Sequence, residues 1–121
     1  MMFPPIYEKC SSNAVVKIVL GNPVRLYPFG QAPQITTVPY AVWQTVTGLP
    51  ENFLGNVPDL DTFTIQIDVY ADSASQVRDV ARALRDAIEP LAYVTAWRGE
   101  SIDPDTKRYR YSLDVDWKVQ R

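Results

Sequence analysis

The chain has 121 residues, 46% of them hydrophobic, and a formal net charge of −2. This length and composition predict one globular domain over residues 1–121. There is no histidine and only one cysteine, Cys10, which excludes Ser-His-Asp and Cys-His catalytic pairs, the common zinc sites and an intramolecular disulfide. We expect Cys10 to be a small buried apolar side chain in a reducing compartment. Residues 1–10 do not resemble a signal peptide and no apolar run reaches membrane length, so a soluble chain is expected.

The first half of the chain mixes helix and strand signals. Ser11 or Ser12 is positioned to cap a second helix after a first one opened by two prolines, and Pro28 stops the strand that precedes it. A run rich in β-branched and aromatic residues follows. The predicted elements are short helices over residues 4–10 and 14–21 and strands over residues 24–27 and 38–46.

The stretch LPENFLGNVPDL, residues 49–60, has two prolines and two carboxylates within its PEN and PDL motifs, and no basic residue. Asp61 follows it, and we refer to residues 50–61 as the connection. It is long for a hairpin, and long irregular loops in small domains are often functional. After it, TFTIQIDVYA alternates apolar and polar residues and predicts a strand over residues 62–71 with one core face.

The clearest helix follows this strand. Asp72 or Ser73 caps it, Gln76 is positioned for a capping box with Ser73, and Pro90 ends it. Its apolar stripe comprises Val77, Val80, Ala81, Leu84 and Ile88. Ion pairs four residues apart are expected from Arg82 to Asp86 and from Arg85 to Glu89.

The last third predicts a hairpin, with strands over residues 92–99 and 108–119 and a turn over residues 99–107. In the second strand Tyr109, Tyr111 and Trp117 share the apolar face, and the charged residues share the other. The fold class is therefore α+β. We expect a mostly antiparallel sheet with helices packed on one face, two short N-terminal helices and one long helix between strands.

The charges are unevenly distributed along the chain. Residues 26–77 contain five carboxylates and no Lys or Arg, whereas the chain from Lys107 onward has a net charge of +3. One interpretation is chance patchiness on a solvated surface. The other is a head-to-tail contact in which the basic part of one copy meets the acidic part of an identical neighbour.

Asp114 and Asp116 are the one carboxylate pair that suggests chemistry, because residues two apart in a strand point to the same face. Such a pair suits a divalent cation. The alternative is a solvated outer face in which Arg110 and Lys118 balance the two carboxylates. The five glycines form no phosphate-binding loop.

Nucleic-acid binding is disfavoured. The aromatic and basic residues of the last strand alternate, so stacking and phosphate contacts would lie on opposite faces. The acidic isoelectric point, about 5.0, also opposes tight binding to phosphate backbones.

Several sequence features together resemble the small tail completion proteins of long-tailed bacteriophages, a family that includes tail terminators and tail-to-head joining proteins. They are, in order, paired N-terminal helices ending in LG, VRLYPFGQAPQ, PYAVWQ with the PEN-containing loop, IQIDVYAD, and a helix with ALRDA. The resemblance is strongest over residues 21–88 and weakens in the closing hairpin.

The resemblance implies a virion protein, assembled in the host cytoplasm, that forms a ring of typically six copies at the head-proximal end of the tail tube. Such a ring stops tube polymerisation and presents a surface to the head connector or neck protein. The implied partners are other copies of the chain, the tail tube protein and the connector, with DNA only passing through the channel. It implies no enzymatic activity, no cofactor and no membrane.

Under this hypothesis the 50–61 connection projects toward a neighbouring subunit or the tube, and its acidic residues face the channel. The expected contact residues are Phe53, Leu54, Val57, Asp59, Leu60, Asp61, Arg108 and Arg110. Two alternatives remain open, namely a small-molecule- or divalent-metal-binding domain around Asp114 and Asp116, and a dimeric interaction module.

Overall fold

The computed structural model describes residues 3–33, 37–51, 57 and 59–121. Three helices and five strands follow one another in the order α1 (Ile6–Ser11), α2 (Ala14–Leu20), β1 (Leu26–Pro28), β2 (Tyr40–Pro50), β3 (Leu60–Ala71), α3 (Ala74–Ile88), β4 (Tyr93–Ile102) and β5 (Tyr109–Gln120). The predicted α+β class is confirmed, with two short helices first and one long helix between strands.

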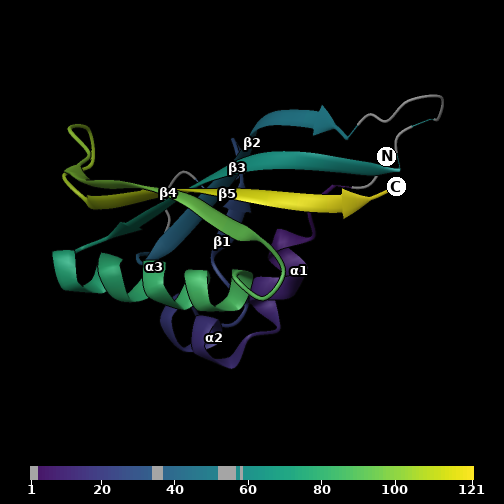
Figure 1. Cartoon of the computed structure of the whole chain (residues 1–121). Helices are drawn as coiled ribbons and strands as arrows, with labels where there is room; N and C mark the ends of the chain where they lie inside the picture. The colour runs from purple at the N-terminus through teal and green to yellow at the C-terminus, as the bar shows by residue number, and fades with distance from the viewer. Residues whose placement is uncertain (1–2, 34–36, 52–56, 58) are drawn as a thin grey trace.

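The five strands form one sheet in the order β1-β2-β3-β5-β4. All neighbours are antiparallel except β1 and β2, which run parallel. The three helices lie on one face of this sheet (Figure 1), and the other face carries no helix of the described chain. The end of β2 and the start of β3 lie at the opposite end of the sheet from the β4–β5 turn (Figure 1).

Helix α3 forms as its sequence predicts. The Ser73 hydroxyl accepts a hydrogen bond from the Gln76 amide at 3.2 Å, and the Gln76 side chain accepts one from the Asp72 amide at 3.2 Å. The first bond satisfies an amide that a helix start leaves without a partner. The second goes to the amide of Asp72, the residue before the cap, and not to the Ser73 amide that the predicted capping box would engage. The predicted apolar stripe is buried against β3 and β5.

The core lies between the sheet and the helices. It is built from alternate residues of β3, from Phe63 to Val69, and of β5, from Leu113 to Val119, together with the buried side of each helix. Cys10 of α1 is fully buried within it, and burial raises the pKa of its thiol to about 12. The predicted apolar role of Cys10 is confirmed. No helix within the described residues is long and apolar enough to cross a membrane.

Several predicted boundaries are wrong. Helix α2 is capped by Asn13, not by Ser11 or Ser12, because the Asn13 side chain accepts hydrogen bonds from the amides of Val15 and Val16 at 3.0 and 3.1 Å. Strand β1 begins at Leu26 instead of Val24, after a cis peptide bond between Asn22 and Pro23.

The strands that flank the 50–61 connection are longer than predicted. Pro50 ends β2 opposite Asp61, and β3 already begins at Leu60. The Glu51 amide donates to the Leu60 carbonyl at 2.8 Å and closes the ladder. The connection between the two strands is therefore residues 51–59. Strand β4 likewise extends to Ile102, and the turn before β5 shortens to residues 103–108.

Candidate functional site

The end of the sheet beside the β2–β3 connection holds most of the predicted contact residues. Val57 and Asp59 are exposed, and Leu60 is half-buried in the first position of β3. Asp61 differs, since only 5% of it is exposed. Phe53 and Leu54 lie outside the described residues.

Asp61 is held by its own chain. The Arg121 guanidinium donates to both carboxylate oxygens, from Nε at 3.0 Å and from a terminal nitrogen at 2.9 Å. This two-point hydrogen bond lowers the pKa of Asp61 below its ordinary value and raises that of Arg121. Such bidentate pairs fix geometry as well as charge.

Glu51 is held in the same way at this end of the sheet. Its carboxylate accepts a hydrogen bond from the Thr62 hydroxyl at 2.6 Å and lies 3.6 Å from the ammonium of Lys118. The hydroxyl, and then the ammonium, lower the pKa of Glu51. Basic residues of the chain end thus neutralise acidic residues of the middle within one copy, so the uneven charge along the sequence is largely paired inside the fold.

Arg108 and Arg110 lie on the helix-free face of the sheet, near the opposite end. Arg110 donates to the Asp68 carboxylate at 3.3 Å, and the Ser112 hydroxyl donates to the same oxygen. The Arg108 guanidinium lies 5.6 Å from the centre of the Tyr40 ring, a cation–π distance. The structure therefore separates the predicted basic contacts from the predicted acidic ones.

Asp114 and Asp116 do share the helix-free face, as predicted, but the expected balance by Arg110 and Lys118 is wrong. Asp114 instead pairs with Arg98 of β4, with both N–O distances 2.7 Å. Asp116 accepts a hydrogen bond from the Thr64 hydroxyl at 2.8 Å. A bulge in the β4–β5 pairing beside Trp97 and Gly99 accompanies the placement of Arg98, which the pattern of one strand does not reveal. No cluster of three or more His, Cys, Asp or Glu side chains occurs among the described residues.

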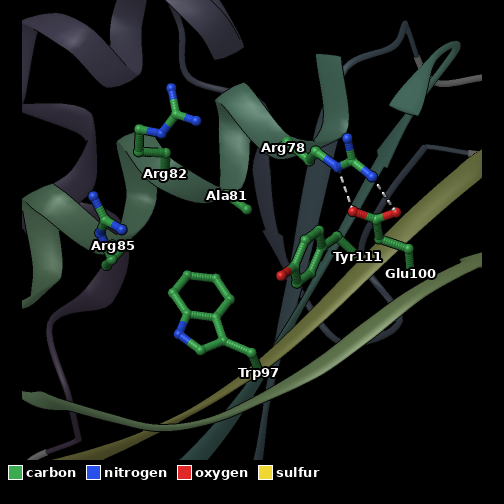
Figure 2. Close-up of a pocket in the computed structure, with 7 residues that line it drawn as sticks. All are labelled: Arg78, Ala81, Arg82, Arg85, Trp97, Glu100 and Tyr111. Carbon is green, nitrogen blue, oxygen red and sulfur yellow. Dashed lines mark hydrogen bonds and ion pairs between the residues drawn. The ribbon is translucent and has the colours of Figure 1, made fainter. Parts of the chain in front are cut away.

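A groove between helix α3 and strand β4 is the site that the sequence analysis missed (Figure 2). We call it the arginine groove. Its volume is about 290 Å³, and it is lined by Arg78, Ala81, Arg82 and Arg85 of α3, Trp97 and Glu100 of β4, and Tyr111 of β5. The small side chain of Ala81 leaves room between the arginines and the strands.

The groove combines positive charge with aromatic surface. Arg78 and Glu100 bridge helix and strand at one end through two hydrogen bonds, one of them 2.9 Å long (Figure 2). This contact raises the pKa of Arg78 and lowers that of Glu100. Trp97 and Tyr111 meet edge to face, with ring centres 5.6 Å apart. Such a surface is suited to carboxylates flanked by apolar groups.

The arginine spacing was visible in the sequence. Positions 78, 82 and 85 are four and three apart, so the three guanidiniums share one side of α3. The sequence predicts ion pairs along the helix for Arg82 and Arg85. The expected Arg85–Glu89 pair is present at 3.9 Å, but the expected Arg82–Asp86 pair is wrong, because Arg82 contacts Asp79 at 3.8 Å.

A second cavity, of about 680 Å³, lies beside β1. It is lined by Tyr7 of α1 and by residues 22–28 and is largely apolar. Exposed apolar side chains also occur on β2, at Val46 and Leu49, and on the edge strand β4, at Tyr93. The molecule thus exposes apolar surface at both edges of its sheet.

The fold is similar to that of chains in two solved structures. A chain of the structure described as "Virion of native gene transfer agent (GTA) particle" superposes with a TM-score of 0.75 at 14% identity, over 96% of this chain and 92% of that chain. The "Structure of bacteriophage SPP1 gp17 protein" gives a TM-score of 0.59 at 11% identity, over 96% and 86%. At these identities the likeness shows the fold. No curated protein sequence matches the chain.

The sequence itself matches a family model. The family is described as "Tail completion protein gp17", and the match covers residues 4–120. This range includes every helix and strand of the described residues, the arginine groove and the β2–β3 connection. The chain therefore belongs to the tail completion protein gp17 family and is a virion protein of the tail completion class, which confirms the resemblance predicted from its sequence.

Proposed function

We propose that copies of this chain form a ring, typically of six, at the head-proximal end of a phage tail tube. The ring stops polymerisation of the tube and gives the head connector a surface to bind. The observation that carries this proposal is the family match over residues 4–120. The similar chain in a gene transfer agent virion supports a place in an assembled particle.

The role we propose is structural and needs no cofactor. The carboxylates that suggested metal chemistry have partners within the fold, since Asp114 pairs with Arg98 and Asp116 with Thr64. The Arg98 pair engages only one oxygen of Asp114, and the other, Oδ1, is buried without a hydrogen-bond partner among the described residues. The alternative of a divalent-metal domain has less support than an assembly role.

We propose two contact regions for assembly. The first is the β2–β3 end of the sheet, with Phe53, Leu54, Val57, Asp59, Leu60 and Asp61. The exposed Val57 supports it, since 78% of this side chain is accessible in the isolated chain. Asp61 contributes to this region as an ion pair with Arg121, because the two side chains are already paired within one copy. The second region is the helix-free face around Arg108 and Arg110.

The proposed function is tested by electron microscopy of lysates from the phage or prophage that encodes the chain, with a stop codon in its gene. Overlong, uneven and headless tails are expected if the ring ends tube growth. Tails of normal length beside filled heads would assign the chain to head–tail joining. Supplying the wild-type gene in trans is the control and must restore virions. Intact virions without the chain would contradict the proposal.

A further inference from the structure

We propose that the arginine groove of one copy binds the β2–β3 connection, residues 51–59, of the next copy in the ring. The groove supplies cationic and aromatic groups, and the connection supplies carboxylates and apolar side chains. The inference rests on the proposed ring and names the contact that builds it.

Charge favours this pairing. Arg78 is engaged by Glu100, but Arg82 is largely exposed, and its contact with Asp79 is long, at 3.8 Å. Arg85 contacts Asp86 at 2.9 Å on the helix surface. Exposed ion pairs of this kind are weak and exchange partners easily. An entering carboxylate would therefore find guanidiniums that can turn toward it at small cost.

The aromatic side chains of the groove, Trp97 and Tyr111, favour a ligand that has apolar groups as well as charge. Trp97 is 43% exposed although it lies beside buried Ala81, and its indole N–H has no hydrogen-bond partner in the part of the chain that the structure describes. An indole that binds an apolar side chain on its face and a carbonyl at its nitrogen is a common anchor of protein interfaces.

The connection has the matching composition. Between β2 and β3 the sequence reads ENFLGNVPD, with a carboxylate at each end, three large apolar side chains and no basic residue. Glu51 is paired with Lys118. Asp59 is held less firmly, since its charge raises the pKa of Arg121, while the Arg121 guanidinium makes its hydrogen bonds to Asp61. We therefore take Asp59 as the carboxylate that meets a guanidinium of another copy.

A copy cannot fill its own groove. Val119 pairs with Asp61 at the connection end of β5, and Tyr111 in the groove lies eight positions away along the same strand. At about 3.4 Å per residue this separation is roughly 27 Å. The Arg121 amide donates to the Asp59 carbonyl at 2.9 Å, which holds Asp59 at the far end of β5. The ligand must therefore come from another copy.

Because the groove and the connection are different patches of the chain, the contact is heterologous. Each copy would donate its connection to one neighbour and receive the connection of the other. Repetition of such a contact closes into a ring when the rotation allows. This geometry agrees with the separation of the arginine groove, which includes Tyr111 of β5, from the start of β3, which pairs with the other end of β5.

The test is a charge swap in the full-length chain, with self-association measured by sedimentation velocity over a concentration series. Arg82→Glu with Arg85→Glu, and separately Asp59→Lys, are each expected to weaken association by about tenfold or more. An equimolar mixture of the two variants is expected to recover association, because each altered groove then meets an altered connection. Recovery would also demonstrate that both variants are folded.

The matched control is Lys9→Glu with Lys17→Glu, which changes the net charge equally on exposed positions of α1 and α2 outside the groove. It is expected to associate like the wild type. Unchanged association in the groove variant, failure of the mixture to recover, or a wild-type chain that stays monomeric at its highest soluble concentration would overturn the inference. The ring proposal would still be judged separately, from tail morphology in the stop-codon lysate.

Discussion

Arg121 and Asp61 lie 60 positions apart in the sequence, yet the guanidinium of one holds both carboxylate oxygens of the other, at 2.9 and 3.0 Å. The pair links the residue that follows β5 to the second residue of β3, where the β2–β3 connection ends. It also lowers the pKa of Asp61, chiefly through the hydrogen bonds from Arg121.

This pair makes stability depend on acid pH. A carboxyl whose pKa is lower in the folded than in the unfolded state contributes stability above its unfolded pKa, here near 3.8, and loses it as the pH falls through the folded pKa. Asp61→Asn is expected to lower the thermal midpoint at pH 7, and the difference from the wild type is expected to shrink below pH 4. Asp59→Asn is the control. A difference that stays constant down to pH 2 would contradict the assignment.

The packing of α3 gives a stability prediction. Leu84 is fully buried between the helix and the sheet, so Leu84→Ala leaves a cavity and is expected to cost about 2–5 kcal/mol in the free energy of unfolding. The change is measured by urea denaturation. Arg82→Ala on the exposed side of the same helix is expected to stay within about 0.5 kcal/mol. Equal losses in the two variants would argue against the helix orientation described here.

The cap of α2 gives a smaller effect. The Asn13 side chain satisfies two amides of the first turn, so Asn13→Ala is expected to cost about 1 kcal/mol in chemical denaturation. Asn13→Asp retains the acceptor and is expected to restore most of the loss. An unchanged free energy of unfolding in Asn13→Ala would mean that the cap does not stabilise the fold.

The buried thiol gives a kinetic prediction. Burial raises the pKa of Cys10 to about 12, so almost no thiolate is present at pH 8 in the folded state. We expect a thiol reagent to label the native chain at the rate of unfolding, and to label it at once in denaturant. Fast labelling without denaturant would contradict the placement of Cys10 in the core.

The helix-free face gives an association prediction. Reversal of Arg108 and Arg110 to Glu is expected to weaken self-association if their charges cross a contact between copies. Because Arg110 also pairs with Asp68, the control is Arg110→Gln with Asp68→Asn, which removes that pair and leaves Arg108 unchanged. Sedimentation velocity measures the self-association of both double variants. Unchanged association in the reversed variant would exclude this face from the contact.

Local periodicity made much of the fold predictable. The alternation in β3 and the stripe of α3 each depend on neighbours within a few residues, so the core positions from Phe63 to Val69 and from Val77 to Ile88 follow from the sequence. The length of β2 could not be predicted from local sequence, because the strand extends over Gly48 to Pro50 only through its pairing with β3.

The candidate sites were less predictable because their partners are distant in sequence. Arg98 reaches Asp114 from a neighbouring strand, and Arg78 reaches Glu100 across the groove. Periodicity identifies the face on which a residue lies but not which element lies opposite. The charge pattern therefore suggested contacts between copies where the fold forms Lys118–Glu51 and Arg121–Asp61 within one copy.

The central claim is that the chain forms a ring at one end of the tail, and its location can be observed directly. Isolated tails labelled with a gold-conjugated antibody against this chain, viewed by negative-stain electron microscopy, are expected to carry gold only at the head-proximal end. Label along the tube, label at the distal end, or unlabelled tails from virions that contain the chain would contradict the account.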